Sequence, residues 1–294
     1  MLKRSDFRFL DRLRVRWAEV DLQKIVFNGN YLMYFDTAVA GYWRAMALPY
    51  HEAMERLHGD LYVRKATLEY EGSARYDDQL EIGIRCTRIG NSSMLLSAAA
   101  FRGESRLVHG ELVYVFADPA TQTSRPVPQA LRDVLNGFEA GQPMAQVRVG
   151  DWAELGEAAR AIRQAVFVDE QRIPAELVCD EADATALHAV AFNRLGMPVA
   201  SGRMLGLPEG VAKIGRMATL STVRGGGLGR QVLHALMQAA RARGEREIML
   251  HAQGSAVAFY LRDGYVPHGP VFQEAGVPHQ EMRFALAAFR PAGG

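Results

Sequence analysis

One helix in the first half of the chain is apolar on nearly every face, and this feature limits the fold most narrowly. The segment from Tyr31 to Met46 reads YLMYFDTAVAGYWRAM. A surface helix has a polar side, whereas a helix that is apolar all round must be covered by other elements. We therefore expect residues 31–46 to form a helix that is buried on most sides rather than a surface helix.

Runs of alternating apolar and polar residues lie on both sides of this helix in the sequence. A period of two is typical of half-buried strands. It occurs before the helix at Leu13, Val15 and Trp17, and after it in residues 61–70, 80–86, 93–101 and 107–116. Turns at Gly90-Asn91 and Arg102-Gly103 are short enough for hairpins. The first half is thus expected to have an α+β fold, with one buried helix and a mainly antiparallel sheet.

A stretch rich in proline, glycine and small residues divides the chain, whose 294 residues favour two domains. Residues 121–128 hold two prolines, a short helix is expected around residues 129–135, and residues 136–146 add Gly137, Gly141 and Pro143. Such composition is typical of a solvated linker. We therefore expect one domain at residues 1–140 and a second at residues 147–294.

The second half alternates helices and strands, which predicts an α/β fold. Leu155, Ala159, Ile162 and Val166 would share one helical face. Strands are expected at residues 187–194, 199–205, 213–220, 247–252 and 280–285, and helices at residues 228–239 and 256–263. A glycine-rich turn falls between the third of these strands and the helix that follows it, a place where proteins commonly bind an anion.

Charge and cysteine content exclude several classes of protein. The 34 basic and 33 acidic residues leave a formal charge of +1, without the basic excess of a nucleic-acid binder. The apolar runs are shorter than the ~20 residues that span a bilayer, and the N-terminus lacks the apolar core of a signal peptide. Cys86 and Cys179 are too few for a disulfide framework. We expect a cytoplasmic protein that binds neither membrane nor nucleic acid and needs no metal.

The segment that joins the first strand to the buried helix has the residues for attack on a carbonyl group. Asp21 leaves the strand, and the helix would begin close to Asn28. Free backbone N–H groups at a helix start can stabilise an oxyanion, and a nearby carboxylate can attack or activate water. The alternative is structural, with Asp21 in a loop and Asn28 or Asn30 as a helix cap.

The run VRWAEVDLQKIVFNGNYLMYFDTA resembles the signature of hotdog-fold acyl-CoA thioesterases of the 4-hydroxybenzoyl-CoA thioesterase and YbgC type. LEYEGSARYDDQLEI and the Pro126-Val-Pro128 end are also similar to that family. The resemblance implies a helix wrapped by a sheet, a homo-oligomer formed through this domain, Asp21 as nucleophile or general base, and the N–H near Asn28 as oxyanion donor. Lys24 replaces a glycine that is common in relatives, and Phe27 and Asn28 replace a frequent His or Tyr.

A second cluster of functional residues lies in the glycine-rich turn RGGGLGR. Glycines let the backbone approach a pyrophosphate, and successive N–H groups at a helix start form an anion-binding nest. The turn lacks the Gly-Lys-Ser/Thr of a Walker A loop and the later acidic residue of a Rossmann fingerprint. A turn without any ligand is the alternative. The residues concerned are Arg224, Gly225, Gly226, Gly227, Leu228, Gly229 and Arg230.

This turn resembles the acetyl-CoA loop of GNAT N-acetyltransferases, and RQAVFVDEQRIP and EAGVPHQEM are similar to the ElaA subgroup. The resemblance spans about residues 150–285. It implies acetyl-CoA as a substrate, an amine acceptor, and pairing of the pantetheine arm with the strand at Met217, Ala218 and Thr219. It also makes Tyr260 the general acid that protonates the leaving thiolate, although a core aromatic beside Phe259 is the structural alternative.

The general base for the amine stays open among four residues and water; the four are Glu170, Asp183, His188 and His251. His279 either lines the acceptor pocket or ends a loop. Taken together, the two resemblances predict a bifunctional coenzyme A enzyme, with thioester hydrolysis in the first half and acetyl transfer to an amine in the second. The alternative is an acetyltransferase whose hotdog half only binds acyl-CoA or forms dimers.

Overall fold

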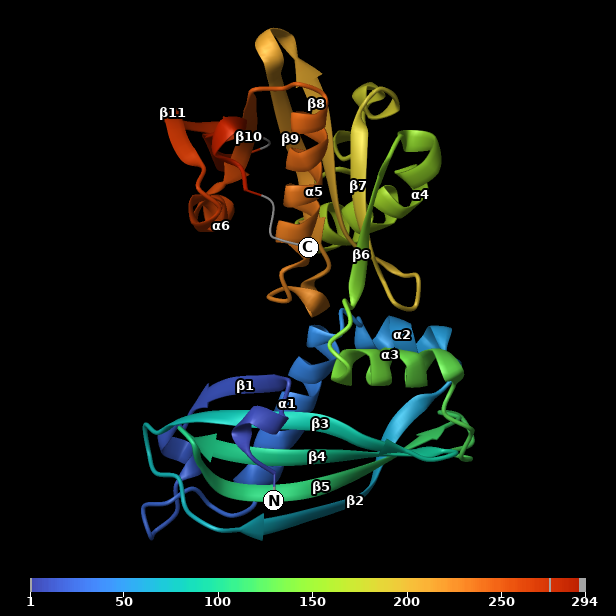
Figure 1. Ribbon diagram of the computed structural model, residues 1–294, viewed down its shortest axis with the longest axis vertical. Coiled ribbons are helices and arrows are strands. Elements are labelled where there is room, and N and C mark those ends of the chain that lie inside the picture. Colours follow the sequence, from blue (N-terminus) through green and yellow to red (C-terminus); the bar gives the residue numbers. More distant parts are fainter. Residues whose placement is uncertain (1, 275, 291–294) are drawn as a thin grey trace. The chain divides into compact units, whose positions relative to one another are not determined.

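The computed structural model describes residues 2–274 and 276–290, and the chain divides into two compact units, residues 1–144 and 145–294 (Figure 1). Each unit has its own sheet. None of the described helices is long and apolar enough to cross a membrane.

The first unit is built on a five-stranded antiparallel sheet in the order β1-β3-β4-β5-β2. Its strands are β1 (Phe9–Arg14), β2 (Asp60–Tyr70), β3 (Gln79–Ile89), β4 (Ser93–Arg102) and β5 (Ser105–Ala117). The expected α+β architecture is confirmed, although β1 begins earlier than predicted and Trp17 lies in a 3-10 turn beyond it. The strand ends there because Arg16 and Glu19 bond to each other and close the turn η2 (Trp17–Glu19).

Helix α1 (Asn30–Ala45) packs against the sheet with one face (Figure 1). The expected burial on most sides is wrong, because Leu32 and Met33 are 39% and 43% exposed and the helix presents an outer face. Phe35, Ala38 and Tyr42 are fully buried. Two shorter helices complete the unit, α2 (Tyr50–Arg56) and α3 (Gln129–Glu139), together with the 3-10 turn η1 (Arg4–Asp6).

The expected linker is largely absent, because α3 continues four residues beyond the predicted helix end at Leu135. Phe138 is buried edge-to-face against Tyr42, with ring centroids 5.2 Å apart. The Glu139 carboxylate accepts hydrogen bonds from the Tyr42 hydroxyl (2.5 Å) and the Cys86 N–H (3.1 Å). These contacts stabilise a helical end that the glycine-containing sequence does not favour, and they leave residues 140–144 between α3 and the next strand.

The second unit has a seven-stranded sheet in the order β11-β12-β10-β9-β8-β7-β6, in which only β9 and β10 are parallel. Its strands are β6 (Ala145–Gly150), β7 (Leu187–Asn193), β8 (Pro198–Leu207), β9 (Val211–Thr219), β10 (Glu247–Gln253), β11 (Val266–Glu274) and β12 (Val277–Ala285). Strands β6 and β11 were not predicted: β6 occupies part of the expected linker, and the residues of β11 are mostly exposed, without apolar alternation.

Helices α4 (Trp152–Arg163) and α5 (Leu228–Ala242) cover opposite faces of this sheet. Leu155 and Ala159 of α4 pack on Val190, whereas α5 packs on the face that carries Gly202. A π-helical segment, η3 (Gln164–Glu170), continues α4, and the short helix α6 (Val257–Arg262) follows β10. The remaining one-turn helices are η4 (Ala175–Leu177), η5 (Glu181–Ala184), η6 (Pro208–Gly210), η7 (Ser221–Val223), η8 (Gly254–Ala256) and η9 (Leu286–Ala288).

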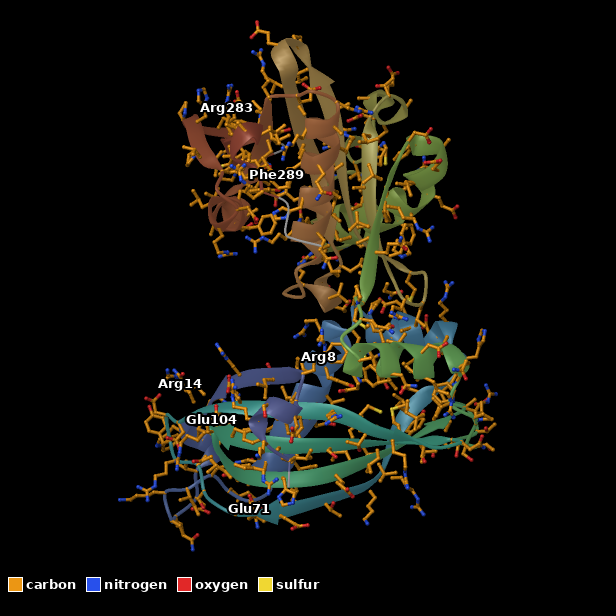
Figure 2. All side chains as sticks on the ribbon, in the orientation of Figure 1. Arg8, Arg14, Glu71, Glu104, Arg283 and Phe289 are labelled. Carbon is orange, nitrogen blue, oxygen red and sulfur yellow. The ribbon has the colours of Figure 1, made fainter. Side chains whose placement is uncertain are left out.

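The end of the described chain closes this unit. Phe289, labelled in Figure 2, is buried with its ring 5.5 Å from that of His234 on α5. On β12, Arg283 pairs with Glu247 and Glu281 (Figure 2). The last strands therefore belong to the fold that supports the predicted site.

Candidate active sites

Asp21 lies in a tight turn between η2 and α1. A bridge between Val20 and Val26 closes the turn, and the Asp21 N–H donates to the Ile25 carbonyl at 2.9 Å. One oxygen of the Asp21 carboxylate accepts the Gln23 N–H at 2.8 Å. The other oxygen accepts no hydrogen bond within the described residues, so the half-buried carboxylate keeps one oxygen for another partner.

Lys24 holds the backbone shape that favours glycine. Its φ of +61° lies in the left-handed region, which costs a residue with a Cβ atom about 1–2 kcal/mol. This is the position at which the resembling family commonly has glycine. The turn therefore has a backbone conformation that suits glycine, and lysine at this position adds backbone strain without changing that conformation.

The backbone ahead of α1 has free hydrogen-bond donors. Within the described residues, the N–H groups of Asn28 and Gly29 have no acceptor, and both residues are exposed. The Asn28 carbonyl accepts the Tyr70 hydroxyl of β2 at 3.1 Å, which fixes the orientation of that peptide. Free N–H groups at the start of a helix can stabilise an oxyanion through both hydrogen bonding and the helix dipole.

A buried carboxylate that we did not predict, Glu19, holds this segment in place. Its side chain accepts the Tyr34 hydroxyl at 2.7 Å and the Arg16 guanidinium, while its carbonyl accepts the Phe27 N–H and the Asn30 amide. Burial acts to raise the pKa of Glu19, but hydrogen bonds from Arg16 and Tyr34 outweigh it and hold the pKa below the usual range. Its sequence neighbourhood shows no pattern that would single it out.

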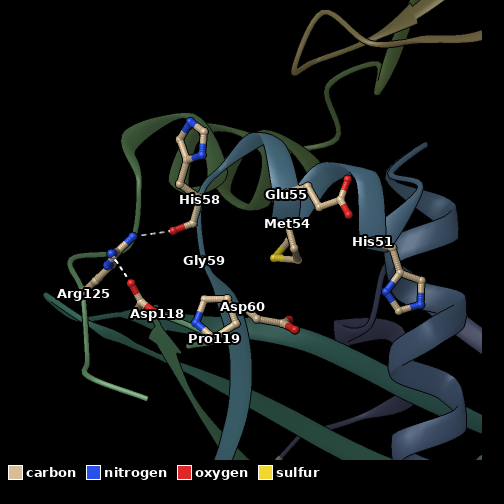
Figure 3. A pocket seen from close by; sticks show the side chains of 9 residues that line it. All are labelled: His51, Met54, Glu55, His58, Gly59, Asp60, Asp118, Pro119 and Arg125. Carbon is tan, nitrogen blue, oxygen red and sulfur yellow. Dashed lines mark hydrogen bonds and ion pairs between the residues drawn. The ribbon is translucent and has the colours of Figure 1, made fainter. Parts of the chain in front are cut away.

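A separate cavity of about 500 Å³ in the first unit does not include Asp21 or Asn28 (Figure 3). It lies where α2 leads into β2, and Arg125 closes one side by pairing with Asp118 and donating to the His58 carbonyl. Its lining residues are His51, Met54, Glu55, His58, Gly59, Asp60, Asp118, Pro119 and Arg125. It is not part of the predicted thioesterase site.

In the second unit, the glycine-rich turn leaves a row of free amides. Gly225 (φ +88°) and Gly227 (φ +80°) are left-handed, and α5 begins directly after Gly227. Within the part of the chain that the structure describes, none of the six N–H groups from Gly225 to Arg230 has an acceptor. A Cβ atom at Gly225 or Gly227 would meet nothing within 4 Å. This open row of donors at a helix N-terminus has the geometry of an anion-binding nest.

The two arginines of the turn pair with carboxylates that we did not predict. Arg224 binds Glu170 through two hydrogen bonds of 2.7 and 2.6 Å, and Arg230 donates to Asp263 at 2.6 Å. Their guanidinium groups therefore brace the turn against η3 and the end of α6, while the backbone remains available to a ligand.

Strands β9 and β10 separate beside this turn. Their parallel pairing stops at Lys213 and Met249, so the edge of β9 from Ile214 onward has no strand partner on that side within the described residues. A bulge next to Arg216 (φ +53°) turns the strand before Met217, Ala218 and Thr219. Ala218 is buried, whereas Met217 and Thr219 are half-buried. An extended ligand arm can hydrogen-bond to such an unpaired edge.

The open edge leads into a cavity of about 580 Å³ that brings together parts of the chain far apart in sequence. Met217 and Tyr260 both line it. The Tyr260 hydroxyl has no hydrogen-bond partner within the described residues, and burial raises the pKa of Tyr260 above the usual range. The other lining residues are Phe167, Gln171, Ile173, Leu177, Val178, Asp180, Arg203, Lys213, Ile214, Gly215, Arg216, His251, Ala252, Gln253, Ala256, Glu274, Val277 and His279.

Three of the four candidates for the general base, Glu170, Asp183 and His188, lie outside the cavity of the second unit. Glu170 is held by Arg224, and that hydrogen bond lowers the pKa of Glu170. Asp183 is 2% exposed and binds Arg163 and Arg203, while His188 is fully buried against the Asp183 carbonyl. None of these three lines the cavity.

His251 does line the cavity, and a carboxylate orients it. Its Nδ1 lies 2.8 Å from Oε2 of Glu274, a residue that the hairpin of β11 and β12 brings across from β10. His279 lines the same cavity and bonds to the Val277 carbonyl through Nδ1 at 2.8 Å. The carboxylate–imidazole pair is the arrangement that general bases commonly have. Glu274 is the first residue of the EAGVPHQEM segment, and nothing in the sequence indicates that it contacts His251.

No group of three or more His, Cys, Asp or Glu residues in residues 2–274 and 276–290 could hold a metal ion. The thiols of Cys86 and Cys179 are free.

Two family models match the chain, one in each unit. The thioesterase superfamily matches residues 23–109, and the acetyltransferase (GNAT) domain matches residues 165–286. An uncharacterized N-acetyltransferase of Bacillus subtilis, YjcF, is 37% identical over 122 residues, which is 41% of this chain and 86% of that protein. The acyl-CoA thioester hydrolase YbgC of Escherichia coli O157:H7 is 26% identical over 123 residues, 40% of this chain and 89% of YbgC.

Among solved structures, a gentisyl-coenzyme A thioesterase matches with 19% identity and a TM-score of 0.39, over 43% of this chain and 99% of that one. Both matching families use coenzyme A thioesters. The chain belongs to the GNAT acetyltransferases through its second unit and carries a thioesterase-superfamily domain in its first, so the expected order of a hotdog fold followed by a GNAT fold is confirmed.

Proposed function

We propose that the chain is a bifunctional coenzyme A enzyme that hydrolyses an acyl-CoA thioester in its first unit and transfers acetyl from acetyl-CoA to an amine in its second. The observation that supports this most strongly is the row of six free amides at the start of α5, next to the cavity that Tyr260 lines. The amides would bind the pyrophosphate of the cofactor, and the free edge of β9 at Met217 would pair with its pantetheine arm.

In the proposed acetyl transfer, the amine nitrogen attacks the thioester carbonyl carbon while His251 removes a proton from the nitrogen. The carbon–sulfur bond then breaks, and the Tyr260 hydroxyl protonates the departing thiolate. Glu274 would hold the imidazole of His251 in position through its 2.8 Å contact. Burial favours the protonated form of Tyr260, which suits a proton donor.

The test of this half measures amine-dependent release of coenzyme A from acetyl-CoA by the intact protein. His251→Gln is expected to lower kcat by about 10²–10⁴-fold, the usual contribution of a general base. Glu274→Gln should lower kcat less and displace the pH profile, because it acts only through His251. An unchanged kcat in His251→Gln would assign the base to water.

In the proposed hydrolysis, the N–H groups of Asn28 and Gly29 hold the thioester oxygen while Asp21 attacks the carbonyl carbon or activates a water that does so. The carbon–sulfur bond then breaks and coenzyme A leaves as the thiol. Water supplies the oxygen of the released acid, either in the attack itself or by hydrolysing the anhydride formed with Asp21. Asp21→Asn keeps the size of the side chain and its acceptor for the Gln23 N–H but removes the charge. It should abolish hydrolysis. Glu52→Gln is a matched control, because Glu52 is an exposed carboxylate on α2 without an ion pair within the described residues.

Lys24 supports a second candidate function, in which the first unit only binds acyl-CoA or forms dimers. Lys24 occupies the strained position beside Asp21 at which glycine is common in the resembling family. The two candidates differ in one measurement. A wild-type protein that binds acyl-CoA but releases no coenzyme A without an amine has a non-catalytic first unit.

We also propose that the chain forms homo-oligomers through its first unit. Strand β2 is a sheet edge of eleven residues whose outer side has no strand partner in the part of the chain that the structure describes, and Val63 and Tyr70 on it are about half exposed. Trp17 and Leu22, close to Asp21 in the chain, are 77% and 102% exposed. Long edges and large exposed apolar side chains commonly mark interfaces. A monomer by light scattering at micromolar concentration would overturn this proposal.

We place the protein in the cytoplasm, where its two thiols would stay reduced.

A further inference from the structure

The lining of the cavity in the second unit has more basic than acidic side chains. The cavity is lined by three cations, Lys213, Arg203 and Arg216, and by two carboxylates, Asp180 and Glu274. Arg203 has two carboxylate partners, because one of its Nη atoms donates to Asp180 at 2.5 Å and to Asp183 at 2.9 Å. The other two cations have fewer carboxylate partners among the described residues.

Arg216 has hydrogen-bonding capacity to spare. Among the described residues its guanidinium makes one hydrogen bond, from an Nη to Asp180 at 3.0 Å, and its Nε is buried without any partner. Asp180 is itself shared with Arg203. A guanidinium carries five N–H donors in a planar fork that fits a carboxylate or phosphate. A buried donor without a partner costs free energy, which a ligand acceptor would recover.

The backbone at Arg216 is strained, and the strain occurs at a bulge that determines where this side chain lies. Its φ of +53° is rare for a residue with a Cβ atom and lies at the bulge of β9. Strain of this kind persists where the surrounding structure holds it and is common at ligand sites. Bulges also change the direction in which a side chain points. Here the bulge accompanies an arginine that lines the cavity.

Lys213, unlike Arg216, has no carboxylate partner among the described residues. It precedes the bulge on β9, lines the same cavity and has no ion pair within residues 2–274 and 276–290. Burial acts to raise the pKa of Glu274, but the hydrogen bond with His251 and the nearby charges, that of Lys213 among them, lower it. An unpaired ammonium therefore lies on the same wall as the proposed base.

We propose that the acceptor is an amine that also has an anionic group, a carboxylate or a phosphate, which Arg216 and Lys213 bind while the amine faces His251. The inference rests on the proposed acetyl transfer and names the class of its substrate. A polyamine, the opposite class, would bring further positive charge toward Lys213, which has no ion pair among the described residues, and toward Arg216, whose one carboxylate partner is shared with Arg203.

The test compares matched amines on the intact protein with acetyl-CoA. The pairs are 4-aminobutyrate with butylamine, and 2-aminoethyl phosphate with ethanolamine; spermidine represents cationic acceptors. A charge-assisted hydrogen bond corresponds to about 10–100-fold in an equilibrium or rate constant. We expect kcat/KM to favour at least one anionic member of the pairs by that factor. Equal or better use of the neutral or cationic amines would overturn the inference.

Variants of Arg216 locate the effect. Arg216→Met should bring the ratio of kcat/KM between the anionic amine and its neutral counterpart close to one, and Arg216→Lys should restore part of this ratio. Arg243→Met is the control, because Arg243 is exposed at the end of α5 and its side chain has no partner within the described residues. A preference that survives in Arg216→Met would overturn the assignment.

The design separates this inference from the proposed function. If all amines are acetylated equally, acetyl transfer stands and the anionic acceptor is wrong. If no amine is acetylated, the proposed function is wrong, and calorimetry with 4-acetamidobutyrate then tests the anion site directly. Wild-type protein should bind this carboxylate at least tenfold more tightly than Arg216→Met, and equal affinities would overturn the site.

Discussion

Replacing Tyr260 by phenylalanine removes one oxygen atom from the cavity of the second unit. The tyrosine ring packs edge-to-face on Phe259 and Tyr265, with centroids 4.9 and 5.6 Å away, and phenylalanine keeps both contacts. The hydroxyl has no hydrogen-bond partner among the described residues, so no protein hydrogen bond is lost. We therefore expect the free energy of unfolding to change by less than about 1 kcal/mol.

The effect on catalysis should be much larger. A positioned proton donor contributes about 10²–10⁴ in rate, which equals roughly 3–5 kcal/mol of the activation barrier. Steady-state kinetics with acetyl-CoA and a saturating amine should show this loss in kcat, while calorimetric titration gives a dissociation constant for acetyl-CoA within a few-fold of the wild-type value. Adding the amine should not change the dissociation constant of the variant for acetyl-CoA.

Tyr265→Phe is the matched control. The Tyr265 hydroxyl is also buried without a partner, but Tyr265 does not line the cavity. Its removal should leave kcat unchanged and not destabilise the protein, because an unsatisfied buried group is removed. If Tyr260→Phe keeps wild-type kcat, or if the two variants lose kcat equally, Tyr260 is not the proton donor.

Three further predictions concern the cofactor loop, the buried ion pair and the domain boundary. Gly227→Glu should weaken acetyl-CoA binding at least tenfold by calorimetry, because a Cβ atom is strained at φ +80° and the added charge would face a pyrophosphate, a repulsion of order 4 kcal/mol at 4 Å near a protein surface; unchanged affinity would mean that the loop does not bind the cofactor. Asp183→Asn should destabilise the second unit by about 3–5 kcal/mol at pH 7, because it leaves the fully buried Arg163 without its carboxylate. Burial acts to raise the pKa of Asp183, but Arg163, the Asp180 N–H and Arg203 together lower it. The stabilisation by the Asp183 carboxylate is therefore complete above the ordinary Asp pKa of about 4 and is lost as the pH falls through the lower pKa of the folded state. A stability difference between variant and wild type that stays constant on acidification would contradict this. Limited proteolysis should cut within residues 140–144 and leave two folded fragments, consistent with proposed domains at residues 1–140 and 147–294, whereas first cleavage elsewhere or loss of structure in both fragments would count against independent folding.

Periodicity in the sequence was sufficient to predict both fold classes. The apolar helix at residues 31–46 requires a covering sheet, and α1 with its five-stranded sheet confirms this. The prediction failed where tertiary contacts outweigh local composition. Gly137 suggests a loop, but Phe138 and Glu139 bind Tyr42 and Cys86 and extend α3. Strand β11 is mostly exposed, so its sequence has no apolar alternation to detect.

The candidate sites could be located from motifs, but their internal partners could not. RGGGLGR has enough glycine to predict a nest, whereas nothing in it indicates that Arg224 and Arg230 bind Glu170 and Asp263, which are 54 and 33 residues away. The contact of His251 with Glu274 depends on how the β11–β12 hairpin folds. Likewise, the sequence shows that Lys24 differs from the glycine common in the family that this segment resembles. The φ angle of Lys24 was needed to show that the backbone still has the left-handed conformation that favours glycine.

The central claim is that two separate sites in one chain act on coenzyme A thioesters. It is tested most directly by measuring coenzyme A release from an acyl-CoA panel, with and without an amine, for the wild type, Asp21→Asn and Tyr260→Phe. We expect Asp21→Asn to lose the amine-independent release and keep the amine-dependent release, and Tyr260→Phe to do the reverse. If either variant lowers both activities equally, or if neither variant changes its own activity, the two-site account is contradicted.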